Sequence, residues 1–506
     1  MAVSDFEGVP DFEVVIGLEV HCQLATATKM FTPCAYAIGA EPNTQIDAYT
    51  LGLPGTLPVP NREAVDDALR LALALHCIVQ PVSRWARKHY FYPDLPKGYQ
   101  ITQADQPYAR DGYIEIPDRA APDDSLATKR IPLQRIHIEE DAGKSTHGAD
   151  ISLVDYNRAG APLVEIVSLP ELRSAVEAAD YMRELRTIVR YLGISEANME
   201  AGTMRCDANV SLRRPGQTEL GTRCEIKNLN SFKFLEAAIN AEVRRQADLL
   251  ERGEAIVQST MSYDPGRDQT KVMRSKEAAA DYRYFPEPDM PPLLIDEAWI
   301  AASKAKLPEL AWDRRRRLVA LGLSAYDAGV LTAERELCDY FDAVLALLPV
   351  PAAGSGALAQ TQAKRVANWI AGELLRLLNQ SGQSIGECPV APAALAELLG
   401  LLDAATISGR AAKEVLDKAF HERLSPTAIV ERDGYRQVSD HGAIAALVRE
   451  VVARNPAQLE QLRAGKDKVR GFFVGQVMRE SRGQANPQVV QTILAEVLAE
   501  LLAQED

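Results

Sequence analysis

The chain has 506 residues, of which 47% are hydrophobic and 25% are charged, as in ordinary globular proteins. Its net charge of -14 excludes a protein that coats nucleic acid by bulk attraction, although a local basic surface remains compatible with it. The seven cysteines are scattered without a C-x-x-C pair, which predicts reduced thiols and no zinc site of that kind. Without a visible signal peptide or a long apolar run, we expect a cytoplasmic protein with no membrane association.

The chain changes character near residue 295. Residues 1–295 combine short alternating runs, broken by Pro and Gly, with helical patterns at Arg62–Leu75, Leu172–Tyr191 and Phe234–Glu251. This mixture predicts an α+β domain built on an antiparallel sheet. The following residues have helical periodicity, interrupted by the small-residue linker "LPVPAAGSGALAQTQ". We therefore expect a sheet-based domain over 1–295, a helical domain over 296–405 and a helical tail over 406–506.

Several predicted strands carry polar side chains on one face. In "EVVIGLEVHCQL" (13–24) the apolar residues alternate, so that Glu19 and His21 lie on the opposite face. Four more segments repeat this arrangement, with His137, Glu139 and Asp141 in "RIHIEEDAG", Glu165 in "PLVEIV", Asp207 and Asn209 in "RCDANVS", and Glu225 and Lys227 in "RCEIKN".

A single strand of this kind is usually a solvated sheet face. Five such strands favour a shared divalent cation, because exposed faces more often carry Thr, Lys, Arg and Ser. Carboxylate-dominated ligands predict Mg²⁺ before Zn²⁺. His21 is either a ligand or a donor that orients a carboxylate.

The segment "EEDAGKST" (139–146) superficially resembles a P-loop. The P-loop motif requires a glycine where this chain has Ile138, and the strand-to-helix context is missing, so we exclude it. Gly143 and Lys144 form either a phosphate-binding turn or an ordinary charged turn. The sequence contains neither a nucleophile elbow nor an amidase-type Ser-Ser-Lys arrangement, so we do not expect this chain to generate ammonia.

Long motifs identify a resemblance to one family. "SLVDYNRAGAPLVEIVS" (152–168) resembles the signature of the B subunit of the bacterial glutamyl/aspartyl-tRNA(Gln/Asn) amidotransferases. The family's other motifs follow in order along almost the whole chain: "VIGLEVHCQL", "YFYPDLPKGYQITQ", "RIHIEEDAGKSTH", "RCDANVSLR", "EIKNLNSF", "DYRYFPEPD" and "GFFVGQVMRESRGQANP".

The resemblance implies a ligase that works in a heterotrimer. Its partners would be an amidase-like A subunit, which releases ammonia from glutamine, and a small C subunit. The B subunit would bind Glu-tRNA(Gln) or Asp-tRNA(Asn) and use ATP to phosphorylate the side-chain carboxylate, and ammonia would then displace the phosphate. The implied fold is a cradle-shaped kinase domain, a helical domain and a YqeY-like tail that binds tRNA.

The resemblance also implies roles for individual residues. The catalytic magnesium ligands fall on Glu19, His21, Glu139 and Glu165. Contacts to the ATP and its metal are expected from Lys144, Asp207, Glu225 and Lys227. In the tail, basic residues outnumber acidic ones between Arg463 and Arg482, which predicts contacts to tRNA phosphates. A solvated helix face is the alternative for these tail residues, which are Lys466, Lys468, Arg470, Arg479 and Arg482.

Two other functions remain open at this stage. The chain could be a non-catalytic scaffold that holds tRNA for its partners, but a scaffold would not need acidic residues on one face of several strands. It could also be a self-sufficient carboxylate–amine ligase, which would require activity of the isolated chain with ammonia and a small free acid.

Overall fold

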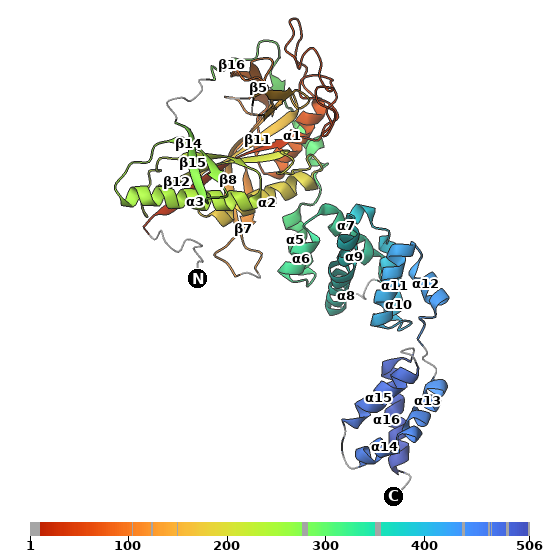
Figure 1. Cartoon of the computed structure of the whole chain (residues 1–506). Coiled ribbons are helices and arrows are strands. Elements are labelled where there is room, and N and C mark those ends of the chain that lie inside the picture. Colours follow the sequence, from red (N-terminus) through yellow and green to blue (C-terminus); the bar gives the residue numbers. More distant parts are fainter. Residues whose placement is uncertain are drawn as a thin grey trace. The chain divides into compact units, whose positions relative to one another are not determined.

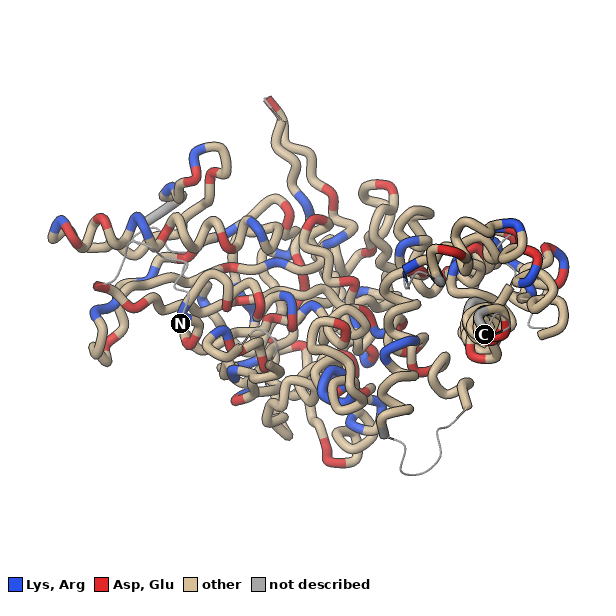
Figure 2. Tube along the Cα trace, turned by 90° about the horizontal axis from the view of Figure 1, so that it is seen from below, with Lys and Arg blue, Asp and Glu red and all other residues tan. Residues whose placement is uncertain are grey.

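The computed structural model describes residues 11–103, 105–122, 125–148, 150–275, 282–349, 356–437, 441–463, 466, 468–481 and 485–503. The chain divides into two compact units (Figure 1). The first contains residues 1–317 and 333–335, and the second contains residues 318–332 and 336–506. Acidic and basic residues are interspersed along both units (Figure 2).

A ten-stranded sheet organises the first unit, with the order β15-β14-β13-β12-β1-β11-β8-β6-β2 and with β7 paired to β8. Strand β1 therefore lies in the middle of the sheet, between β11 and β12. The strands are β1 (Glu13–Gln23), β2 (Ile78–Val79), β6 (Ala109–Arg110), β7 (Tyr113–Pro117), β8 (Thr128–Glu140), β11 (Pro162–Ser168), β12 (Met204–Arg213), β13 (Cys224–Leu229), β14 (Ser259–Asp264) and β15 (Gln269–Ser275).

The large sheet is mixed: it is mainly antiparallel, as expected from the sequence, and it contains one parallel pair. Strands β13 and β14 are parallel, and the other pairs are antiparallel. A parallel pair needs a long crossover connection, and helix α3 (Phe232–Glu251) provides it between these two strands. Small satellite sheets pair β9 (Lys144–His147) with β10 (Ser152–Asp155), β4 (Ala86–His89) with β5 (Tyr99–Thr102) and β16 (Phe285–Pro286), and β3 (Val82–Ser83) with β17 (Leu293–Leu294).

Helices cover one face of the large sheet. Leu18 and Val20 of β1 share a buried core with Leu185 of helix α2 (Ala175–Tyr191) and Ile239 of α3. Figure 1 shows α2 and α3 running alongside the sheet. Helix α1 (Arg62–Ala74) contributes further residues to the same core. The alternate residues of β1, which include Glu19 and His21, are left on the other face.

The predicted helices of the first unit are confirmed, with changes of one to three residues at one end of each. Helix α2 begins at Ala175 instead of residue 172, because Ser174 caps it and Leu172 forms a β-bridge with Ile16. Asn61 and Ser231 cap α1 and α3 in the same way. Helix α4 (Glu297–Lys304) also belongs to this unit, and α5 (Ala311–Ala320) contains the boundary between residues 317 and 318.

The second unit is helical and contains two separate cores. One includes buried residues from Leu318 to Val430, and the other includes buried residues from Ile444 to Leu498. The first core is built from α6 (Ala325–Leu331), α7 (Arg335–Leu347), α8 (Gly356–Asn368), a π-helical segment η2 (Trp369–Leu374), α9 (Leu375–Ser381), a 3-10 turn η3 (Ile385–Glu387), α10 (Pro392–Asp403), α11 (Gly409–Glu422) and α12 (Pro426–Asp433). The second is built from α13 (His441–Arg454), α14 (Pro456–Arg463), α15 (Val469–Glu480) and α16 (Pro487–Ala503).

Contacts between helices can be compared with the expected domain limits at residues 295 and 405. Trp299 of α4 donates a hydrogen bond to Asp66 of α1, so residues just beyond 295 pack with the first unit. Helices α11 and α12 share a core with α10, although the expected limit at 405 lies between α10 and α11. The limits 1–295, 296–405 and 406–506 remain predictions of domain organisation. Among the described residues, no helix has the length and apolarity needed to cross a bilayer.

Candidate active site

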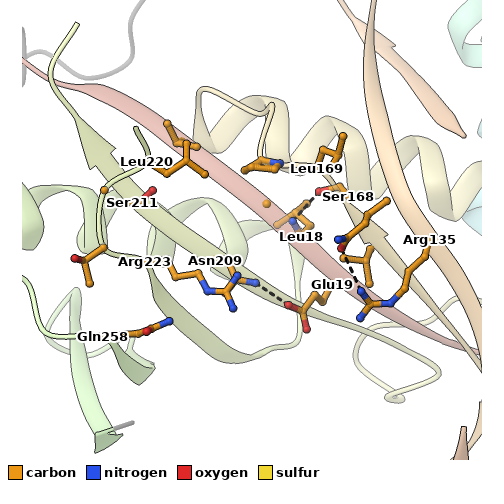
Figure 3. A pocket seen from close by; sticks show the side chains of 17 residues that line it. Leu18, Glu19, Arg135, Ser168, Leu169, Asn209, Ser211, Leu220, Arg223 and Gln258 are labelled. Carbon is orange, nitrogen blue, oxygen red and sulfur yellow. Dashed lines mark hydrogen bonds between the residues drawn. The ribbon is translucent and has the colours of Figure 1, made fainter. Parts of the chain in front are cut away.

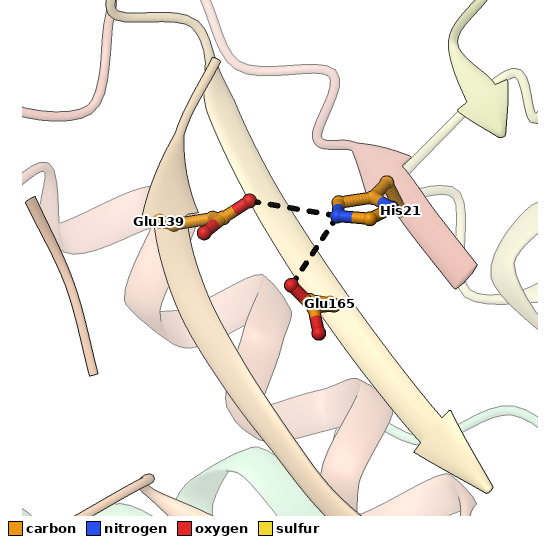
Figure 4. A group of neighbouring side chains, drawn as sticks. All are labelled: His21, Glu139 and Glu165. Carbon is orange, nitrogen blue, oxygen red and sulfur yellow. Dashed lines mark ion pairs between the residues drawn. The ribbon is translucent and has the colours of Figure 1, made fainter. Parts of the chain in front are cut away.

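The centre of the candidate site is a group of three side chains from three neighbouring strands. His21 of β1, Glu139 of β8 and Glu165 of β11 offer ligand atoms that all lie within 4.8 Å of one another. Nε2 of His21 is 3.2 Å from Oε2 of Glu165 and 3.8 Å from Oε1 of Glu139 (Figure 4). We call His21, Glu139 and Glu165 the carboxylate–histidine cluster.

Sheet register brings this cluster together. His21 and Glu165 are direct partners in the β1–β11 pair, and Glu165 and His137 are direct partners in the β11–β8 pair. Cross-strand partners project from the same face, so these three side chains lie in a row. Glu139 follows His137 by two residues on β8 and therefore shares its face.

Burial and neighbouring charges fix the ionisation of the cluster. Burial alone would raise the pKa of Glu139, but Lys88 and His137 outweigh it and lower that pKa. His137 and His21 in the same way outweigh the burial of Glu165 and hold its pKa well below the usual range. Burial disfavours charged His137, yet Glu165 and Glu139 raise its pKa to about 9. Both carboxylates are therefore anionic at neutral pH.

The cluster fits a divalent cation. Glu139 is only 2% exposed, and its Oε2 atom is buried without a hydrogen-bond partner. A buried anionic oxygen in this state is costly unless a cation or donor satisfies it. One imidazole and two carboxylates are ligands that Mg²⁺ and Mn²⁺ accept. The predicted ligands His21, Glu139 and Glu165 are thus brought together.

Glu19, the fourth predicted ligand, lies at the edge of the cluster. Its Oε1 atom accepts a hydrogen bond of 2.9 Å from Asn209 Nδ2. Burial raises its pKa, and the negative charges of Glu165 and Glu225 raise it further. Glu19 is therefore near the same anionic centre, although it is not among the three residues whose ligand atoms converge.

A pocket with a volume of about 660 Å³ opens next to Glu19. Gly17 of β1, Ser168 of β11 and Asn209 of β12 are among the residues that line it. Figure 3 shows the side chains of Ser168 and Asn209 on either side of Leu18 and Glu19. Arg135 and Arg223 line it and provide positive charge. Arg135 also reaches the cluster, with Nη2 at 3.9 Å from Oε1 of Glu165. The pocket and the carboxylate–histidine cluster therefore adjoin each other.

Asp207, Glu225 and Lys227 form a second charged group on β12 and β13. The ammonium of Lys227 lies 2.5 Å from Asp207 and 2.9 Å from Glu225. Burial disfavours the charge on Lys227, but the two carboxylates outweigh it and raise the pKa. These three predicted residues are thus brought together beside Glu19, and Lys227 is held as a cation.

Lys144 stands in a different environment. It begins strand β9 of a separate two-stranded sheet, where its side chain is exposed. The N–H of Gly143 donates to the carbonyl of Asp94 at 2.8 Å, so this donor is already used within the chain. The absence of a side chain at Gly143 has a packing reason, because a Cβ there would lie 2.8 Å from the carbonyl oxygen of Asp155.

The predicted tRNA-binding residues lie in the tail. Lys468 precedes α15, Arg470 and Arg479 are on it, and all three are exposed, as is Lys466. Arg482 lies outside the described residues. From the sequence we expect Phe472 and Phe473 to pack in the tail core; Phe473 is fully buried there, whereas Phe472 is 37% exposed.

Sequence reasoning missed several residues of the site. His137 and Asn209 had the right strand face but were not chosen as site residues. Lys88 comes from β4, which belongs to another sheet, and no pattern in the sequence links it to Glu139. Arg205 was also missed. It donates to Asp141 at 2.5 Å, and together with Arg158 it overcomes burial and lowers the pKa of Asp141 to about 2.

Comparisons with known proteins show the family of this chain. Residues 14–301 match the GatB/GatE catalytic domain, and residues 355–498 match the GatB domain. The B subunit of the aspartyl/glutamyl-tRNA(Asn/Gln) amidotransferase of Anaeromyxobacter sp. (strain K) is 52% identical over 496 residues, which cover 97% of this chain and 100% of that protein. The protein of the same name from Geotalea uraniireducens (strain Rf4) is 50% identical, in an alignment that covers 96% of this chain and 99% of that protein. The one from Thioalkalivibrio sulfidiphilus (strain HL-EbGR7) is 51% identical, in an alignment that covers 96% of this chain and 100% of that protein. The chain belongs to the GatB/GatE family.

Proposed function

We propose that this chain is the activating subunit of a tRNA-dependent amidotransferase. It uses ATP to phosphorylate the side-chain carboxylate of Glu-tRNA(Gln), Asp-tRNA(Asn) or both, and ammonia from a partner then displaces the phosphate. The observation that carries this proposal is the carboxylate–histidine cluster beside a pocket of about 660 Å³. The names of the relatives supply the substrate class and the reaction.

His21, Glu139 and Glu165 are the residues that would hold Mg²⁺, with Glu19 beside them. A carboxylate that attacks a terminal phosphate brings two anions together, and bound Mg²⁺ would neutralise and orient the phosphate oxygens. The cluster is suited to binding Mg²⁺ because its two carboxylates are both ionised. His21 lies directly opposite Glu165 on the neighbouring strand, so it can complete the set of ligands.

The pocket is our candidate for the nucleotide. Its volume falls within the range of small-molecule sites. Arg135 and Arg223 are placed to meet negative charge, and Gly17 leaves room for close approach of a ligand to the backbone of β1. Glu19 lines this pocket and lies near the cluster, so a nucleotide here would direct its phosphates toward the metal ligands.

Asp207, Glu225 and Lys227 have a supporting role in this proposal. Lys227 can contribute positive charge toward phosphate oxygens while Asp207 and Glu225 hold it in place. Lys144 remains a candidate for a phosphate contact only through its side chain, since the N–H of Gly143 is already bonded.

The wider assignment follows from the family. The first unit would be the cradle-shaped kinase domain, and the tail would be the YqeY-like module that binds tRNA through Lys466, Lys468, Arg470, Arg479 and Arg482. An amidase-like A subunit, which supplies ammonia, and a small C subunit would complete the heterotrimer. The lack of a recognised amidase arrangement in this sequence supports a division of labour of this kind.

A reconstituted assay tests the proposal. The complete complex is given Glu-tRNA(Gln) or Asp-tRNA(Asn), with and without ATP, and both ADP and amidated tRNA are measured. We expect ADP formation that depends on charged tRNA in the wild type and its loss, by at least about 100-fold, in Glu165→Gln. The glutaminase activity of the partner should persist.

A matched control carries the same substitution away from the site. Glu236 forms an exposed ion pair with Arg183, so Glu236→Gln should retain full activity. Full ADP formation by Glu165→Gln would contradict the proposal and would favour the alternative of a non-catalytic tRNA scaffold.

A further inference from the structure

Two imidazoles, one on each side, flank the carboxylate of Glu165. His21 of β1 and His137 of β8 are its direct register partners on the two neighbouring strands. Their Nε2 atoms lie 3.2 Å and 3.3 Å from the same oxygen, Oε2. Of these two histidines, His21 belongs to the group of ligand atoms that converge within 4.8 Å, and His137 does not.

His137 also reaches the other carboxylate. Its Nε2 atom is 3.8 Å from Oε2 of Glu139, whereas His21 approaches Oε1 of the same residue. The two oxygens of Glu139 therefore face different imidazoles. His137 is in contact with both carboxylates of the cluster from the side opposite to His21.

Among the described residues, no hydrogen-bond partner is found for the other ring nitrogen of His137. It is 5% exposed, and its Nδ1 atom is buried without a hydrogen-bond partner. A buried ring nitrogen in this state destabilises the fold, because it has lost its bonds to water. An apolar side chain would avoid that cost, so the reason for a histidine here lies in the contacts that its Nε2 atom makes to the carboxylates.

We propose that His137 is a positioning residue, which holds Glu139 and Glu165 at the spacing that a divalent cation requires without binding the cation itself. This inference rests on the proposed function, since it assumes that the cluster holds a metal. Its physical basis is the repulsion between two buried carboxylates. Nε2 of His137 lies 3.3 Å from Oε2 of Glu165 and 3.8 Å from Oε2 of Glu139, so one imidazole is within ion-pair distance of both oxygens and draws them toward each other.

The substitution His137→Leu removes the donor while keeping a buried side chain of similar size. Both Oε2 atoms would then lose the imidazole that lies beside them, and the two carboxylates would separate to reduce their repulsion. Loss of a partner that orients metal ligands typically weakens metal affinity by about 10–100-fold. His137→Gln keeps an N–H donor in nearly the same direction, so it should lose less affinity than His137→Leu.

The test is a titration of the full-length chain with Mn²⁺, followed by electron paramagnetic resonance at one fixed pH. We expect Mn²⁺ to bind the wild type, His137→Leu to bind it about 10–100-fold more weakly, and His137→Gln to lie between them. The control is His147→Leu. His147 lies on β9, where it bonds to Ser152, so its replacement should not change the affinity. Circular dichroism establishes that each variant is folded.

Three results would overturn the inference. Equal Mn²⁺ affinity of the wild type and a folded His137→Leu would contradict it and leave the proposed function standing. A spin-echo signal from two coordinated imidazoles in the wild type would make His137 a ligand instead. A wild-type chain that binds no Mn²⁺ would remove the metal site from the proposed function and this inference with it.

Discussion

Glu165 lies directly opposite His21 across the β1–β11 pair, with Oε2 of the glutamate 3.2 Å from Nε2 of the histidine. Glu165 is 7% exposed and is flanked on both edges by paired strands, so its carboxylate has little freedom to move. The position of this pair is set by backbone hydrogen bonds of the central strands, not by a loop. The candidate site is therefore built on central strands of the large sheet.

Replacement of Glu19 tests whether the edge of the cluster is needed for chemistry. Glu19→Ala removes a half-buried carboxylate and leaves Asn209 without its hydrogen-bond partner. We expect ATP-driven transamidation to be abolished, because the side chain lies between the pocket and the carboxylate–histidine cluster. Glutaminase activity of the partner, measured in the same preparation, should be unchanged. Full transamidation by Glu19→Ala would defeat the assignment.

A methyl group at Gly17 tests the pocket. The added Cβ would lie 3.6 Å from Pro170, which is ordinary van der Waals contact, so Gly17→Ala should fold normally. The methyl group would take up space on the pocket lining, and we expect the KM for ATP to rise several-fold. The KM for charged tRNA should stay constant. An equal rise in both constants would show that the pocket is not specific to the nucleotide.

The tail can be tested by charge removal. Replacing Lys466, Lys468 and Arg479 with glutamine should weaken tRNA binding and reduce the salt slope by about one per lost phosphate contact. The control is Arg410→Gln, a change at an exposed arginine of α11 in the other helical core. Unchanged affinity at a stated low salt concentration would contradict a role for these residues.

Deletion of the tail gives an independent test. A truncation at residue 405 would divide the core that α10 shares with α11 and α12, so it would damage more than the tail. A cut after residue 437 leaves that core intact and removes α13–α16 together. We expect this shorter chain to lose tRNA affinity and to keep the thermal stability of the first unit.

The pH dependence of stability can be predicted at Glu115 of β7. Its carboxylate lies 2.6 Å from Arg316 and 3.3 Å from Arg130. Burial would raise its pKa, but these arginines outweigh burial and lower it below the ordinary value of 4.5. A lowered pKa means that the ionised form is favoured in the folded state. Its contribution to stability is therefore present above pH 4.5 and is lost as the pH falls through the folded-state pKa.

Melting temperatures of the wild type and Glu115→Gln should consequently differ at pH 7 and converge toward pH 3. The control is Glu336→Gln, the same chemical change at an exposed residue of α7. A difference in melting temperature that stays constant over this range would show that the Glu115 pairs do not stabilise the fold.

Local periodicity was sufficient to predict the strand faces and the main helices. The alternation in β1 placed Glu19 and His21 on one side, and the helical pattern at Arg62–Leu75 became α1. Which strands are neighbours could not be inferred in this way, because it depends on pairings between distant segments. His21 and Glu165 are separated by more than one hundred positions in the sequence, and only the folded sheet brings them together.

Other features had no local signal at all. Lys88 affects the pKa of Glu139 from a separate small sheet, and the parallel pairing of β13 with β14 depends on the path of α3. Glu139 and Glu165 were chosen from the resemblance and from their strand faces, and the structure brings them together with His21. His137 was recognised on the same strand face, but the resemblance assigned it no role, so it was not chosen as a site residue.

Glu139 and Glu140 are successive residues of β8, and they face opposite sides of the sheet. Glu139 contacts His21, whereas Glu140 pairs with the ammonium of Lys97 and accepts from the N–H of Ile101 at 3.0 Å. A shift of β8 by one residue against β11 would turn Glu139 toward the interior and Glu140 toward the face that carries the candidate site. The register of β8 therefore decides which acid reaches the candidate site. A chain folded with β8 shifted by one residue would keep much of its secondary structure and would lack the carboxylate–histidine cluster.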